Sequence, residues 1–350
     1  MQIPIQNIYF LLCYAWNKLD EKELVDVRAS DEKDLVDLLA RVLISGVSRL
    51  FKKGLDRDYI LYQESIPGIK GKLELGATLK KSLLQRGQAH CAFDEFSYNV
   101  LHNQILKATF RLLLKIDNLD AKLKEESLFL FRRFHQVDEV ELQSQLFSRV
   151  KFNRNNYFYD FLVKICSLIF HSLLPTEEAG HYRFMDFIRD ERNMAYLFEE
   201  FIRNFYKAEL IGTKVYREDI LWIAEGDDSS IRLLPKMQTD ITVEIPGKSK
   251  LIIDTKFYKE ALREHYDSRK IREANLYQLF AYLKNIEIKD VVSQNCSGLL
   301  LYPTVHQPLN EKIKVENHLL HFRTINLNQP WQSIHQDLLG IVEECLEVKG

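Results

Sequence analysis

Residues 239–258, TDITVEIPGKSKLIIDTKFY, decide the fold of this chain because they have the pattern of a β-hairpin. Residues 239–245 alternate β-branched and polar side chains, which is typical of a strand. The stretch 246–249, PGKS, is a turn signal, and residues 251–258 form a second apolar-rich run. The chain is therefore predicted to run out along one strand and back along its neighbour.

The predicted hairpin brings two acidic side chains together. If the turn is centred on Gly247, residues whose numbers add up to 494 (twice 247) lie opposite each other, so Asp240 faces Asp254. Because side chains alternate along a strand, Lys256 lies on the same face as Asp254. At about 4 Å and an effective dielectric constant near 20, two carboxylates repel by roughly 4 kcal/mol. A proton on one of them, or a cation between them, removes that cost.

Asp240, Asp254 and Lys256 together can form a metal site with an ammonium group beside it. Carboxylate oxygens are hard ligands, which favour Mg²⁺ or its substitute Mn²⁺. The alternative is a solvated strand face with a surface ion pair, since D-x-K is a short pattern. The apolar residues around it, LIIDTKFY at 251–258, favour the functional interpretation, because buried charges require partners.

Composition describes an ordinary globular protein with room for two or three domains. The chain has 350 residues, of which 46% are hydrophobic and 28% charged. Its 48 basic and 50 acidic residues give a net charge of −2, whereas a protein that binds nucleic acid alone is usually much more basic. If this chain acts on nucleic acid, another molecule supplies most of the electrostatic attraction.

The sequence favours a cytoplasmic protein without a membrane partner. Its first ten residues, MQIPIQNIYF, lack the basic region and small-residue cleavage site of a signal peptide. No apolar run approaches the length of a membrane span. The five cysteines are isolated and odd in number, which is typical of reduced thiols in a protein core.

Apolar periodicity predicts an α/β fold, or a mixed α+β one, with a central mixed sheet flanked by helices. Helical spacing occurs at residues 2–19, 34–51, 98–115, 120–135, 157–174, 193–208, 274–283 and 331–346. Besides the hairpin, strand patterns occur at 58–66, 213–216, 231–237, 297–302 and 325–327. Residues 1–160 are predicted to form a mostly helical domain and 161–350 the sheet domain, although 176–180 is the best linker by composition.

Other stretches are candidates for a role near the hairpin. Glu199, in the middle of a predicted helix, can add an oxygen ligand or can be an ordinary exposed acid. Residues 261–273, ALREHYDSRKIRE, form the most basic local stretch, which can contact a phosphate backbone or face solvent. Gln278 and Tyr282 are four residues apart and share one face of a predicted helix. The turn at 67–72, PGIKGK, lacks the spacing of a phosphate-binding loop.

A divalent ion held by two carboxylates, with a lysine beside it, suits phosphodiester hydrolysis. The ion polarises a phosphoryl oxygen and lowers the pKa of a bound water, and Lys256 can orient that water and stabilise the developing charge. The sequence contains no nucleophile elbow for acyl transfer, and its ten histidines form no zinc pattern.

At these residues the sequence resembles the PD-(D/E)XK nuclease superfamily, and Gln278 and Tyr282 match the Q-x-x-x-Y helix of its RecB-like branch. Nearly the whole chain is similar to the McrC nuclease subunits of GTP-driven, modification-dependent McrBC restriction systems. The segments that carry this similarity are NIYFLLCYAW near the start, IPGIKGKLE at 66–74, GHYRFMDF at 180–187, LLPKMQTDI at 233–241, IIDTKFY at 252–258 and NLYQLFAYL at 275–283.

The resemblance implies roles for individual residues. Asp240 and Asp254 would be metal ligands, Lys256 the catalytic lysine, and Glu199 an extra ligand of the kind that some superfamily members use. It also implies that 161–350 is an endonuclease domain and that 1–160 docks onto a partner. That partner would be a separate McrB-like AAA+ GTPase, which binds GTP, recognises double-stranded DNA carrying modified cytosine and translocates it.

Two other functions remain open at this point. The chain can be a non-catalytic adaptor that only activates the partner GTPase, although the intact set of two aspartates and a lysine argues against this. It can also be a nuclease that works alone, which the implied need for a partner disfavours.

Overall fold

The computed structural model describes residues 3–19, 34–154, 156–176, 181–185, 190–258, 262–265, 268–287, 296–304 and 308–346. The chain divides into two compact units. Unit 1 comprises Met1–Asp31 and Phe187–Gly350, and unit 2 comprises Glu32–Asp186. No helix in the described parts of the chain is both long and apolar enough to pass through a membrane.

This division differs from the predicted boundary at residue 160 in two places, and helix packing explains both. α7 (Tyr157–His171) is buried against other helices of unit 2, so the residues after 160 stay with that unit. α1 (Ile5–Ala15) packs against α8 (Glu191–Glu209) in unit 1, so the start of the chain belongs with its second half.

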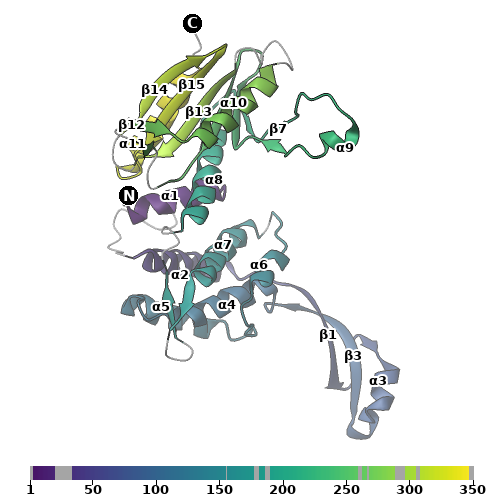
Figure 1. Cartoon of the computed structure of the whole chain (residues 1–350). Helices are drawn as coiled ribbons and strands as arrows, with labels where there is room; N and C mark the ends of the chain where they lie inside the picture. Colours follow the sequence, from purple (N-terminus) through teal and green to yellow (C-terminus); the bar gives the residue numbers. More distant parts are fainter. Residues whose placement is uncertain are drawn as a thin grey trace. The chain divides into compact units, whose positions relative to one another are not determined.

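A six-stranded mixed sheet forms the centre of unit 1 (Figure 1). In spatial order its strands are β14 (Asn310–Val315), β15 (His318–Ile325), β13 (Cys296–Pro303), β10 (Ser249–Thr255), β9 (Ile241–Ile245) and β6 (Lys214–Tyr216). β10, β13 and β15 run parallel, and the other neighbours pair antiparallel. The predicted fold class, with a mixed sheet flanked by helices, is therefore confirmed.

Both faces of this sheet are covered. α10 (Glu273–Glu287) lies on one face, where its Leu279 packs in a buried cluster with Ile252 and Leu300. Gly298 allows this close approach, because a Cβ added there would lie 2.9 Å from Leu279 Cδ2. The side chains that alternate with these along β10 and β13 are also fully buried, and α8 and α11 (Trp331–Leu346) contact the same strands.

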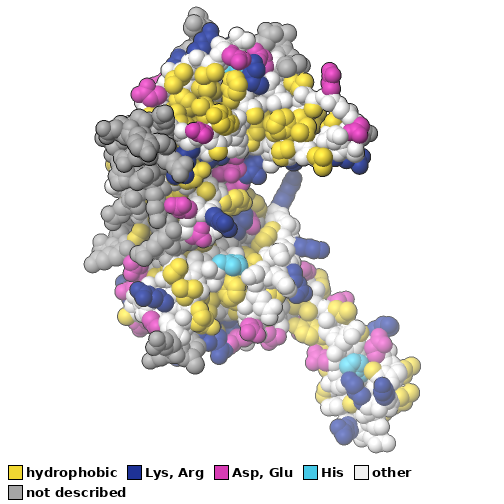
Figure 2. Space-filling view, in the orientation of Figure 1, with side chains coloured by type: hydrophobic (Ala, Val, Ile, Leu, Met, Phe, Trp, Pro, Cys, Tyr) yellow, Lys and Arg dark blue, Asp and Glu magenta, His cyan; other side chains and the backbone are white. Residues whose placement is uncertain are grey.

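An extension between β6 and β9 consists of β7 (Asp219–Ile220), α9 (Asp228–Ile231) and β8 (Met237–Gln238). The predicted strand at 231–237 is therefore wrong over most of its length. Asp227 starts a helical turn instead, since its Oδ1 accepts a hydrogen bond of 2.9 Å from the backbone N–H of Ser230. Apolar side chains are exposed on this extension (Figure 2): Leu221, Trp222, Ile223, Ile231, Leu233 and Leu234.

The predicted last strand at 325–327 is misplaced by several residues. Strand β15 ends at Ile325, and β14, which was not predicted, pairs antiparallel with it. β14 is exposed along most of its length and carries Lys312 and Lys314, so its sequence lacks the apolar signal of a buried strand. A two-stranded sheet, β11 (Leu262–His265) with β12 (Ser268–Ile271), completes the described strands of unit 1.

Unit 2 has a helical body and a projecting arm (Figure 1). The body contains α2 (Leu35–Lys53), α4 (Leu101–Leu113), α5 (Ala121–Arg133), α6 (Ser144–Arg149) and α7, with the short pair β4 (Leu173–Pro175) and β5 (Tyr182–Phe184). The arm contains β1 (Asp58–Pro67), β2 (Lys72–Leu73), β3 (Gln88–Ser97), the helix α3 (Leu75–Lys80) and the 3₁₀ turn η2 (Leu83–Arg86). The predicted turn at 67–72 joins β1 to β2, and no prediction was made for β3.

The arm has a small core and an exposed apolar surface. Only Ala89, Cys91 and Phe93 form its buried cluster. Large apolar side chains elsewhere on the arm are exposed, namely Tyr59, Leu61, Ile69, Leu75, Leu79, Leu84 and Phe96. Exposed apolar groups at this density are typical of surfaces that contact another molecule.

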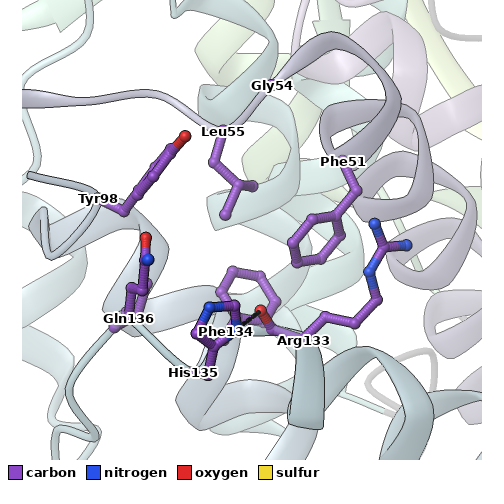
Figure 3. A pocket seen from close by; sticks show the side chains of 9 residues that line it. Phe51, Gly54, Leu55, Tyr98, Arg133, Phe134, His135 and Gln136 are labelled. Carbon is purple, nitrogen blue, oxygen red and sulfur yellow. Dashed lines mark hydrogen bonds between the residues drawn. The ribbon is translucent and has the colours of Figure 1, made fainter.

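A pocket of about 390 Å³ lies at the root of the arm, where α2 ends and β3 re-enters the body (Figure 3). Phe51, Leu55 and Tyr98 line it, and the Arg133 guanidinium lies 4.1 Å from the centre of the Phe51 ring. The pocket belongs to unit 2, whereas Asp240, Asp254 and Lys256 belong to unit 1. The predicted carboxylate site is therefore not in this pocket.

Candidate active site

The hairpin has the predicted register. β9 and β10 pair from Ser249 opposite Ile245 to Ile253 opposite Ile241, so every pair adds up to 494. The turn closes with a hydrogen bond of 3.0 Å from the N–H of Lys248 to the carbonyl of Ile245. Gly247 has a φ of 73°, as the third residue of a Pro-Gly turn requires.

Asp240 lies one residue before β9 and is held at the end of β10. Its Oδ2 accepts hydrogen bonds from the N–H of Thr255, at 2.9 Å, and from Thr255 Oγ1, at 3.3 Å. The register carried one step further puts Asp240 opposite Asp254. The structure thus brings the two predicted carboxylates together at one end of the hairpin.

Asp254 is fully buried and is paired with Lys256. Lys256 Nζ donates a hydrogen bond of 3.0 Å to Asp254 Oδ1 and lies 2.9 Å from Oδ2, to which it has no hydrogen-bond geometry. Nζ also donates to Gln278 Oε1 at 3.3 Å, and Gln278 Nε2 donates to Tyr282 Oη at 2.8 Å. A continuous polar chain therefore runs from β10 to α10 through the predicted residues.

Burial sets the charge states of this pair. Burial raises the pKa of Asp254 to about 7, Lys256 lowers it, and the neighbouring Asp240 raises it. Burial lowers the pKa of Lys256, but Asp254 and Asp240 outweigh it, so that pKa lies above its usual value. Lys256 therefore stays charged at neutral pH, while Asp254 changes its charge near pH 7.

The donor set fits a Mg²⁺ ion. Asp254 Oδ2 is buried without a hydrogen-bond partner among the described residues, which leaves one carboxylate oxygen for a ligand. Asp240 supplies the second carboxylate. No group of three or more His, Cys, Asp or Glu side chains suited to a metal occurs in the described part of the chain. Mg²⁺ commonly takes one or two carboxylates and completes its shell with water and phosphate oxygens.

Glu199 lies near the carboxylates but is held by arginines. Arg203 Nη1 lies 3.2 Å from Glu199 Oε1, and Arg217 Nη2 donates to the same oxygen. Burial and then Asp240 raise the pKa of Glu199, and Arg217 opposes them. Glu199 is thus electrostatically coupled to Asp240, while its carboxylate already has two cationic partners.

A polar network beside the site was not predicted. Asn275 Nδ2 donates to Tyr302 Oη at 3.3 Å, and Tyr258 Oη donates to Asn275 Oδ1 at 3.5 Å. Asn275 precedes Gln278 by three residues and so shares its helix face, which was the available signal. Tyr302 comes from β13, far away in sequence, and no local pattern joins it to the hairpin. Arg217, one arginine partner of Glu199, was missed because it lies outside the helix. Arg203 follows Glu199 by four residues on the same helix, so it was a local signal that was overlooked.

The raised pKa of Asp254 predicts how stability depends on pH without metal. An unfolded aspartate titrates near pH 3.9, so between about pH 4 and 7 the folded chain holds a proton that the unfolded chain has released. The contribution of Asp254 to stability therefore falls as pH rises through this window. We therefore expect the difference in the free energy of unfolding, wild type minus Asp254→Asn, to decrease as the pH rises from about 4 to 7.

Tryptophan fluorescence suits this measurement, because the chain has three tryptophans, Trp16, Trp222 and Trp331, and all belong to unit 1. Denaturant titrations in EDTA at several pH values would give the difference between wild type and variant. A difference that stays constant from about pH 4 to 7 contradicts the assignment of a raised pKa to Asp254.

Comparisons with known proteins cover almost the whole chain. A family model described as McrBC 5-methylcytosine restriction system component matches residues 6–303. A protein of Escherichia coli (strain K12), described as the type IV methyl-directed restriction enzyme EcoKMcrBC, is 35% identical over 346 residues, with 99% of each chain covered.

A solved structure supports the fold at lower identity. It is a half-complex from the tetradecameric assembly of Thermococcus gammatolerans McrB AAA+ hexamers with bound McrC. One of its chains superposes with a TM-score of 0.60 and 15% identity, covering 97% of this chain and 76% of that chain. At this identity the likeness shows the fold alone.

Proposed function

The chain belongs to the family of McrBC 5-methylcytosine restriction system components, and from this premise we propose that it is the DNA-cleaving subunit of such a system. One observation carries the proposal: Asp254 is fully buried next to Asp240 and paired with Lys256, and its Oδ2 accepts no hydrogen bond from a described residue. A buried carboxylate without a full set of partners is costly for a purely structural site. The same arrangement suits hydrolysis of a phosphodiester bond.

Each side chain has a distinct role in this proposal. Asp240 and Asp254 would hold Mg²⁺, or Mn²⁺ in its place, and the bound ion would supply positive charge at the phosphate and a more acidic water. Lys256 places its ammonium beside the reacting phosphate and stabilises the charge that develops there. Gln278 holds the Lys256 ammonium in place, and Tyr282 in turn orients the Gln278 amide.

We further propose that unit 2 docks onto a McrB-like AAA+ GTPase, which binds the GTP and recognises double-stranded DNA with modified cytosine. The T. gammatolerans structure contains McrC bound to McrB AAA+ hexamers, which supports a partner of this kind. The exposed apolar arm is the part of unit 2 that best suits docking, because its own core leaves those side chains uncovered.

The decisive experiment is cleavage by the reconstituted complex. The chain would be co-expressed with the GTPase and mixed with matched DNA duplexes, one with methylated cytosine and one without. We expect cleavage of the methylated duplex only with both GTP and Mg²⁺. Stimulated GTP hydrolysis without any cleavage would favour the adaptor, and cleavage by the chain alone without GTP would favour a self-sufficient nuclease.

Substitutions on the arm test the docking role separately from the cleavage chemistry. Leu75 and Leu79 are exposed on α3, so changing both to Asp adds two charges to the proposed docking surface without disturbing a core. We expect this variant to lose stimulation of GTP hydrolysis and, with it, cleavage. Phe129→Asp, an equally exposed position on α5 of the body, is the matched control. Normal stimulation by the arm variant would contradict the docking role of α3.

A further inference from the structure

Arg272 is an unexplained cation beside the candidate site. It directly precedes α10, and its carbonyl accepts the first helical hydrogen bonds, from the N–H groups of Asn275 and Leu276. Its guanidinium carbon lies 4.1 Å from the centre of the Tyr258 ring. Its Nε is buried without a hydrogen-bond partner among the described residues, and no ion pair to a described side chain occupies the guanidinium.

Tyr258 ties this guanidinium to the active site. It follows Lys256 by two residues in the segment directly after β10. Its hydroxyl donates to Asn275, which donates to Tyr302 in the buried core. The ring on which Arg272 lies is thus anchored at both ends, to the segment that carries Lys256 and to α10.

We propose that Arg272 binds a backbone phosphate of the DNA strand that is cut, a few nucleotides from the reacting phosphate. This rests on the proposed function and extends it to a substrate contact. A guanidinium placed over an aromatic ring can present its terminal nitrogens to a ligand, and these match two phosphate oxygens. The contact positions the DNA and reads no base, because phosphates are common to every sequence.

The spacing along α10 suits such a contact. Arg272 precedes Gln278 by six residues, which is about 9 Å of helix axis, and Gln278 contacts Lys256. Successive nucleotides of one strand rise by about 3.4 Å, so this interval corresponds to roughly three nucleotides. Of the basic stretch at 261–273, the side chains of 261–270 lie outside the described residues, and the described Arg272 carries the proposal.

The test uses the full chain in complex with its GTPase partner and measures the single-turnover rate of DNA cleavage against salt concentration. We expect Arg272→Gln to slow cleavage by about tenfold at moderate salt and to reduce the slope of log rate against log salt by about one. Arg272→Lys keeps the charge and loses the two-oxygen contact, so it should retain the slope and recover part of the rate. Stimulated GTP hydrolysis should be unchanged in both.

Lys284→Gln is the matched control, since it removes one charge from the exposed side of the same helix, where Lys284 pairs with Glu287 and Glu316. The inference is overturned if Arg272→Gln has the same rate and salt slope as Lys284→Gln. It is also overturned if Arg272→Lys is as slow as Arg272→Gln with an unchanged slope, because the guanidinium then only supports Tyr258. A wild-type complex that cuts no DNA instead refutes the proposed function.

Discussion

Replacing Asp254 with Asn is expected to reduce cleavage of methylated DNA by roughly 10³-fold or more while leaving GTP hydrolysis by the partner stimulated. Asn has the same shape, but its amide lacks the negative charge that holds a divalent ion. Asp254 is fully buried on β10, which pairs with β9 and β13 and contacts α10. Cleavage and GTP hydrolysis would be measured in the same reaction.

Asp219→Asn provides the control for this change. Asp219 is an exposed carboxylate of the same unit, paired with Lys236 and with Gln238 Nε2. The complex that carries Asp219→Asn is expected to cut DNA at the wild-type rate. The nuclease assignment is refuted if Asp254→Asn still cuts modified DNA, and the separation of roles is refuted if it also loses stimulation of GTP hydrolysis.

Lys256→Met is expected to have two effects, one on the rate of cleavage and one on stability in the absence of metal. Cleavage should fall by about 10²–10³-fold, because the charge beside the developing phosphate charge is lost. Without metal the variant should also lose stability by a few kcal/mol, since Asp254 remains buried without its partner. Both the tryptophan-detected unfolding midpoint and the cleavage rate would be measured, with EDTA and with Mg²⁺.

The double variant Asp254→Asn/Lys256→Met tests the origin of that destabilisation. With both charges removed, stability is expected to return toward the wild-type value, whereas cleavage stays absent. Lys284→Met controls for the loss of a lysine at an exposed site. If Lys256→Met unfolds at the wild-type denaturant concentration in EDTA, Lys256 does not neutralise Asp254.

The hairpin could be predicted to the residue because its determinants are local. A Pro-Gly turn fixes the register, and the register together with the two-residue alternation fixes which acids meet. Asp254 and Lys256 were identified from one short pattern and Gln278 and Tyr282 from another, whereas the contact between Lys256 and Gln278 was not predicted. Whether these residues perform catalysis remains a prediction for the experiments above.

What could not be predicted depends on partners far away in sequence. Arg217, which follows β6, donates a hydrogen bond to Glu199 on α8. Tyr302 on β13 accepts one from Asn275 on α10. The strand at 231–237 failed because Asp227 caps a turn that outweighs the apolar pattern after it. β14 was missed because an exposed edge strand with lysines has the composition of a loop.

The packing of α1 against α8 has a consequence for how the chain acquires its structure during synthesis. Unit 2 is continuous in sequence and can fold as soon as it leaves the ribosome, whereas unit 1 cannot. Buried residues of α1, such as Leu11 and Leu12, have no cover until α8 emerges, some 180 residues later. The hydroxyl of Tyr14 likewise lacks its hydrogen-bond acceptor until Glu209 has been made. The nascent chain therefore carries an apolar helix that stays uncovered until more than half of the chain has been made.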